Sequence, residues 1–101
     1  MAPQPLSESE LNQALEGLPG WSVQDDRLTR TYHFPGHPPA AAMVAHVSAI
    51  QEELGHHADQ TLSYNTLTVS VNTHSVGGRI TALDTGLAGR IEEIAPGHRA
   101  E

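Results

Sequence analysis

The chain contains no cysteine and no lysine among its 101 residues, and aromatic side chains make up only 4% of it. Without cysteine, disulfide bonds and thiol chemistry are excluded. With so few aromatics, a folded core has to be built mainly from Leu, Ile, Val, Met and Ala. A domain of this size buries about 65% of the surface that its unfolded chain exposes. Self-association is therefore an expected source of additional stability.

Basic residues are also scarce, since five arginines stand against twelve acidic residues and give a formal net charge of −7. This charge repels phosphate backbones, and no arginine cluster offsets it, so nucleic-acid binding is disfavoured. Long hydrophobic segments are missing as well. The longest apolar run, residues 40–45, is far shorter than the roughly 20 residues of a membrane span. Residues 1–6 lack the features of a signal peptide, and we expect a soluble, cytoplasmic protein without a membrane segment.

Local signals predict a short helix and then two strands in the first third of the chain. Ser7 and Glu10 have the spacing of a capping box, in which each side chain binds a free amide of the first helical turn. A Pro-Gly pair ends this helix. Two strands are expected next, at residues 21–24 and 28–32, joined by an Asp-Asp turn.

A long helix is predicted in the middle of the chain. Its apolar residues recur at intervals of four, three and four, which places them on one face: Met43, Val47, Ile50 and Leu54. Gly55 then provides the left-handed residue with which helices commonly end. We therefore expect His56 and His57 to lie directly beyond the C-terminus of this helix.

The second half of the chain predicts two more strands and a last helix. Residues 62–64 and 66–73 have the pattern of a hairpin, and His74 leaves the second strand on its polar side. Thr81 and Asp84 have the spacing of a capping box at the start of the last helix. The apolar stripe of that helix comprises Ile80, Leu83, Leu87, Ile91 and Ile94.

Together these elements predict an α+β fold in the order α-β-β-α-β-β-α. The four strands are expected to form an antiparallel sheet with the helices packed on one face. We expect one domain over residues 1–101, with loose tails at about 1–6 and 96–101.

Histidines and carboxylates are gathered in the second half of the chain: Glu52, His56, His57, His74 and Asp84. Both protonation states of histidine are available near neutral pH, so several imidazoles together suit proton transfer. Plain structural alternatives exist. Glu52 and His56 stand four residues apart, as in an i,i+4 helix contact, and Asp84 could serve only the capping box. Two or three histidines and a carboxylate could also bind zinc or iron, although neighbouring side chains such as His56 and His57 generally diverge.

A longer pattern covers nearly the whole chain, about residues 7–95. Its parts are Glu52-x3-His56-His57, Tyr64-Asn65-x-Leu67-x-Val69, Thr73-His74, Gly77-Gly78 and Thr81-x-x-Asp84. This pattern resembles that of the pterin-4a-carbinolamine dehydratases. Those enzymes remove water from a 4a-hydroxytetrahydropterin to give a quinonoid dihydropterin, while regenerating the cofactor of aromatic amino acid hydroxylases.

The resemblance implies a hydro-lyase with a small pterin substrate, no cofactor and no metal, acting as a homodimer or homotetramer. It implies that the catalytic residues are His56, His57, His74 and Asp84. It also implies that the substrate-binding residues are Glu52, Ala58, Thr73 and Ser75.

Two positions depart from the family pattern. The family usually has proline where this chain has Ala58, and often tryptophan where it has Gln60. Proline would restrict the backbone of the histidine pair, so Ala58→Pro is expected to preserve or raise activity and stability unless the Ala58 amide is hydrogen-bonded. The departures would also fit an alternative function, that of a catalytically weak protein-interaction module. The resemblance allows this function, because some family members act as dimerisation cofactors of a transcription factor.

The remaining candidates are interpreted as structural. Trp21 and Tyr64 are expected to be packing residues. Four histidines match no functional position of the pattern: His33, His37, His46 and His98.

Overall fold

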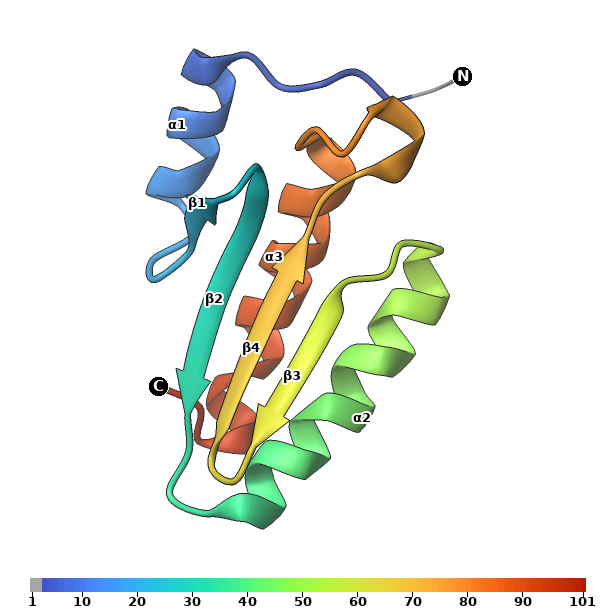
Figure 1. Ribbon diagram of the computed structural model, residues 1–101. Coiled ribbons are helices and arrows are strands. Elements are labelled where there is room, and N and C mark those ends of the chain that lie inside the picture. The colour runs from blue at the N-terminus through green and yellow to red at the C-terminus, as the bar shows by residue number, and fades with distance from the viewer. Residues whose placement is uncertain (1–2) are drawn as a thin grey trace.

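The computed structural model describes residues 3–101 and contains the expected succession of helices and strands (Figure 1). Met1 and Ala2, which belong to the expected N-terminal tail, lie outside the described residues. The elements are α1 (Glu8–Glu16), β1 (Ser22–Gln24), β2 (Arg27–His33), α2 (His37–Leu54), β3 (Asp59–Ser63), β4 (Thr66–Val71) and α3 (Ala82–Ile94), with 3-10 helices η1 (His74–Val76) and η2 (Pro96–His98). The predicted α+β fold and element order are confirmed.

The four strands form one antiparallel sheet in the order β1-β2-β4-β3. Figure 1 shows β2, β4 and β3 side by side, with α2 running along the β3 side. The predicted Asp-Asp turn joins β1 to β2, and Asp25 and Asp26 both have positive φ, 52° and 58°. Two consecutive left-handed residues match the right-handed twist of a two-stranded hairpin. The turn therefore fixes the pairing of the first two strands.

The core lies between the sheet and the long helices. Every second residue of β4 is fully buried, and the intervening threonines and serine are partly exposed, as the alternation predicts. From α2, Met43 and Val47 are fully buried, and from α3, Leu87 and Ile91 are. Each such side chain stabilises the folded state by about 1.5–3 kcal/mol relative to an exposed position.

Two leucines that were expected on buried helix faces are exposed. Leu54, in the last turn of α2, is 40% exposed, and Leu83, in the first turn of α3, is 44% exposed. Successive residues of a helix point about 100° apart, and the neighbouring Asp84 takes the inward-facing position because it caps α3. The prediction that Leu83 belongs to the buried stripe is therefore wrong.

Tyr64 is also exposed, at 69%, and the packing role expected for it is wrong. It was expected to end a strand over 62–64, but β3 spans Asp59–Ser63 instead. Tyr64 has a φ of 48° because it lies in the turn that leads into β4. Trp21, by contrast, is a packing residue as predicted, with 5% of its surface exposed.

A carboxylate of α3 joins this helix to the aromatic part of the core. Glu92 accepts hydrogen bonds from the indole nitrogen of Trp21 at 2.9 Å and from the hydroxyl of Tyr32. Burial raises the pKa of the Tyr32 hydroxyl, and the contact with Glu92 acts in the same direction. This side chain therefore stays a hydrogen-bond donor over the ordinary pH range.

Both ends of the described chain are hydrogen-bonded to the rest of the protein, in contrast to the loose tails expected from the sequence. The amide of Leu6 donates to the carbonyl of Ile80 at 2.9 Å. Glu101 and His33 exchange two backbone hydrogen bonds of 2.8 and 2.9 Å. Within the described residues, none of the helices has the length and apolar character that a membrane crossing requires.

Candidate functional site

The histidine pair follows the C-terminus of α2, as the sequence predicts. Gly55 ends the helix in the left-handed conformation, with a φ of 64°. The amides of Gly55 and His56 both donate to the carbonyl of Gln51. The chain therefore leaves the helix in a tight, hydrogen-bonded turn.

His56 turns inward and contacts Asp84, which comes from the first turn of α3. His56 Nε2 donates to Asp84 Oδ1 over 2.6 Å, and the two side chains are 13% and 0% exposed. The other oxygen, Oδ2, accepts from the Thr81 amide and the Thr73 hydroxyl, each at 2.8 Å. The predicted capping box is present, and the same carboxylate also contacts His56. A buried carboxylate is costly unless its oxygens are bonded in this way.

His57 turns the other way, toward solvent. Its Nε2 donates to Glu52 Oε2 over 2.8 Å, and the side chains are 57% and 80% exposed. The i,i+4 contact between Glu52 and His56, considered as an alternative from the spacing, is not formed, because Glu52 pairs with the second histidine. An exposed pair of this kind contributes little to stability. Because more than half of its side chain is exposed, the His57 imidazole is accessible to a ligand.

His74 lies on η1 and not on a strand, because β4 already ends at Val71. The Thr73 amide donates to the carbonyl of Arg79 at 2.9 Å, which closes the loop between them. Gly77 and Gly78 have positive φ values of 73° and 78°, which L side chains rarely adopt. The closed loop presents His74 at the surface.

All three histidines border one hollow of about 350 Å³. Its lining consists of Gly55, His56, His57, Asn72, Thr73, His74, Ser75 and Leu83. Of the other expected site residues, Asp84 lies behind His56 and Glu52 beside His57. Ala58 follows the pair and is outside the lining.

Three residues of the lining were not predicted as site residues: Gly55, Asn72 and Leu83. Gly55 was predicted only as the residue that ends α2. Asn72 immediately precedes the Thr-His motif, and this position in the sequence was the available signal. The buried Oδ1 of its side chain has no hydrogen-bond partner among the described residues. Leu83 was assigned to the core by helical periodicity, and only its exposure in the structure reveals its place at the hollow.

The two departures from the family pattern have distinct surroundings. The amide of Ala58 donates to Gln51 Oε1 at 3.0 Å. This is the circumstance under which a proline at position 58 is destabilising, so the expected benefit of Ala58→Pro does not apply. Gln60 instead connects β3 to α2, because its amide nitrogen donates to the Ser48 hydroxyl at 3.2 Å.

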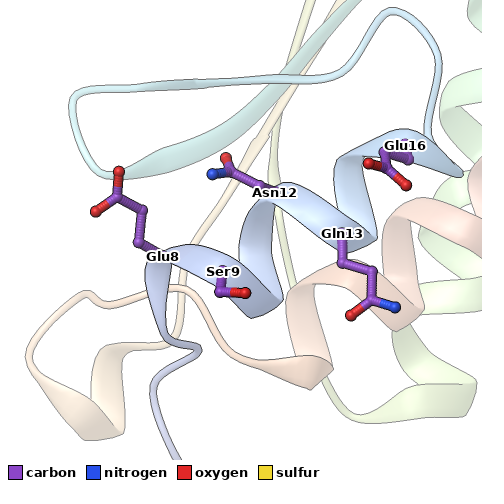
Figure 2. A pocket seen from close by; sticks show the side chains of 5 residues that line it. All are labelled: Glu8, Ser9, Asn12, Gln13 and Glu16. Carbon is purple, nitrogen blue, oxygen red and sulfur yellow. The ribbon is translucent and has the colours of Figure 1, made fainter.

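A larger hollow, of about 680 Å³, lies along α1 (Figure 2). All of its lining residues come from that helix: Glu8, Ser9, Asn12, Gln13 and Glu16. It contains no histidine and no second structural element, so we assign the candidate site to the histidine hollow. Within residues 3–101, no group of three or more His, Cys, Asp or Glu side chains is arranged to hold a metal ion.

A family model and two similar sequences carry the same description. The family model described as pterin 4 alpha carbinolamine dehydratase matches residues 4–94. A putative pterin-4-alpha-carbinolamine dehydratase of Streptomyces avermitilis is 54% identical over 100 residues, which is 99% of each chain. A protein of the same description from Streptomyces coelicolor is 51% identical over 100 residues, again 99% of each chain.

Two solved structures are similar in fold. A transcriptional coactivator/pterin dehydratase from Brucella melitensis has a TM-score of 0.86 and 34% identity, covering 91% of this chain and 99% of its own. A pterin dehydratase-like protein, identified as a RuBisCO assembly factor in the alpha-carboxysome, has a TM-score of 0.64. It is 18% identical and covers 75% of this chain and 89% of its own, so the likeness concerns the fold alone.

Proposed function

The chain belongs to the pterin-4a-carbinolamine dehydratase family, a family of hydro-lyases, and we propose that it removes water from a 4a-hydroxytetrahydropterin to give a quinonoid dihydropterin. The observation that carries this proposal is that three histidines, His56, His57 and His74, line one hollow. One of them is held by a buried carboxylate and the other two are accessible. Such a set offers proton donors and acceptors near neutral pH.

The reaction needs two proton transfers. The bond between C4a and its hydroxyl oxygen breaks, and this oxygen leaves as water after it takes a proton from an acid. The proton on N5 passes to a base, which restores the balance of protons. In this proposal His57 and His74 exchange protons with the substrate, and Asp84 holds His56 in one orientation.

The substrate would be held at the rim of the same hollow. Ser75 lines it with an exposed hydroxyl, and Leu83 offers an apolar surface to a flat ring. Thr73 also lines it, but its hydroxyl donates to Asp84, so in this scheme Thr73 acts through that carboxylate. Glu52 acts through His57 in this scheme, because the two side chains are paired. Ala58 acts through its backbone, which holds the position of the preceding histidine.

Turnover of a synthetic 4a-hydroxytetrahydropterin tests the proposal, with His57→Ala and His74→Ala beside the wild type. General acid–base groups typically contribute about 10²- to 10⁴-fold, so we expect each variant to lose at least 10²-fold in kcat while its circular dichroism spectrum is unchanged. His33→Ala is the matched control, since this exposed histidine lies outside the hollow. Losses below about fivefold in both site variants would refute the assignment.

A second candidate function is a catalytically weak interaction module, or dimerisation cofactor. It is favoured by the 34% identical Brucella protein, which is described as a transcriptional coactivator as well as a pterin dehydratase. The net charge of −7 would favour a basic partner surface. A folded wild-type protein without turnover above the uncatalysed rate would support this function in place of the first.

The proposal includes a homodimer or homotetramer. β3 stands at one edge of the sheet and β1 at the other, and an unpaired edge favours association with another strand. Exposed leucines on α2, β3 and α3 provide further apolar surface. A role beside an aromatic amino acid hydroxylase and a cytoplasmic location stay predictions.

A further inference from the structure

Gln51 is a polar residue on a buried helix face, with only 6% of its surface exposed. It lies in α2, one position after the core residue Ile50. A primary amide is costly to bury without hydrogen bonds, so its partners indicate what it does. Its side-chain oxygen accepts from the amide of Ala58 at 3.0 Å.

The backbone of Gln51 serves the same loop. Its carbonyl accepts from the amide of Gly55 and, at 3.1 Å, from the amide of His56. Three of the four amides over residues 55–58 are therefore bound by one residue. His57 is the fourth member, and it lies between two amides that Gln51 holds.

The side chain of His57 has little else to hold it. Its contact with Glu52 joins two side chains that are 57% and 80% exposed. An exposed pair of this kind holds its two side chains only weakly in one geometry. His56, in contrast, is fixed by the buried Asp84. The orientation of the His57 side chain is consequently set by its backbone. The next backbone amide is that of Ala58, which Gln51 holds.

We propose that Gln51 is a positioning residue for His57, and that its side chain does by a hydrogen bond what a proline at position 58 would do by its ring. Proline fixes its own φ and restricts the residue before it. It has no amide hydrogen, so it cannot coexist with the Gln51 contact. Position 51 and position 58 therefore form a coupled pair, with either a hydrogen bond or a proline holding the loop. The catalytic part of this inference rests on the proposed dehydratase function.

A double-mutant cycle tests the coupling, with Gln51→Met, Ala58→Pro and both changes together. Methionine has a similar length but offers no comparable acceptor. We expect Gln51→Met to lower kcat about tenfold with KM changed less than twofold, because small misplacements of a reacting group cost rate more than binding. Ala58→Pro should lower kcat in the wild-type background, because the buried Gln51 oxygen then loses its donor and lies against the proline ring. It should raise kcat in the Gln51→Met background, where no acceptor is left unpaired. Gln51→Glu keeps an acceptor oxygen and should retain most of the activity.

Two measurements need no substrate, so they separate this inference from the proposed function. Hydrogen exchange at the Ala58 amide should become at least tenfold faster in Gln51→Met. The ring NMR signals of His57 should shift or broaden in that variant and return toward the wild-type positions when proline is added. Gln60→Met is the matched control, since Gln60 binds α2 outside the histidine loop. It should leave both signals and kcat unchanged.

The outcomes are distinct. An inactive wild type whose Ala58 exchange and His57 signals respond as expected would refute the proposed function and support the positioning role. Unchanged exchange and unchanged His57 signals in Gln51→Met would overturn the inference, whatever the turnover. So would effects of Gln51→Met and Ala58→Pro that simply add, because a coupled pair has to be non-additive.

Discussion

Replacing Asp84 by asparagine tests whether one buried carboxylate holds both the start of α3 and the first histidine. The two side chains have nearly the same size, so the change removes charge and one acceptor without opening a cavity. Asp84 is fully buried, and its two oxygens accept from His56, Thr73 and the Thr81 amide over 2.6–2.8 Å. Asparagine has one acceptor oxygen for these three donors.

The better orientation of the asparagine places its oxygen toward Thr73 and Thr81, which preserves the cap. Its amide nitrogen then faces His56, so the charge-assisted hydrogen bond to that imidazole is lost. Such bonds contribute about 1.5–3 kcal/mol net, and solvent screens this one only slightly, because the carboxylate is 0% and the imidazole 13% exposed. We expect the free energy of unfolding to fall by roughly 2 kcal/mol. With about 4–8 °C per kcal/mol for a domain of this size, Tm should drop by about 10 °C.

Urea unfolding, followed by the fluorescence of the single tryptophan, measures this change at a fixed protein concentration, because association would otherwise shift the midpoint. Asp59→Asn is the matched control. That carboxylate pairs with Arg27 but is 82% exposed, so its removal should change stability by less than about 0.5 kcal/mol. If Asp84→Asn changes stability no more than Asp59→Asn does, the carboxylate does not hold the site as argued. In that event His56 is not fixed by Asp84 either.

Two further predictions concern pH and association. Burial raises the pKa of the Tyr32 hydroxyl in the folded protein, while the pKa of an unfolded tyrosine is about 10. Above that pH the unfolded state loses the proton more readily than the folded state does. The free energy of unfolding is therefore unaffected by this group below about pH 10 and falls above it. Urea midpoints measured between pH 8 and 11 should show this decline, and Tyr32→Phe should flatten it; equal slopes in both proteins would contradict the argument. Sedimentation at tens of micromolar protein, about a cell-like concentration, should show a dimer or tetramer, because the sheet has unpaired edges, and a monomer would contradict that expectation.

The sequence by itself determined the elements and their order. Helix starts and ends depend on neighbours in the chain, so Ser7 with Glu10 located the start of α1 and Gly55 located the end of α2. The alternation of β4 likewise identified its buried face. Because these signals are local, the position of the histidine pair at the end of α2 could also be predicted.

Only the tertiary structure decided which groups meet at the site. Sequence spacing suggested Glu52 with His56, but His56 pairs with Asp84, 28 residues away, and Glu52 pairs with His57. Leu83 was assigned to the core by its spacing, yet it lines the hollow. The periods of a helix or strand define its faces, but which faces come together depends on how α2 and α3 pack against the sheet. The buried contact between Gln51 and Ala58 arises in the same way, from a loop that folds back onto its own helix.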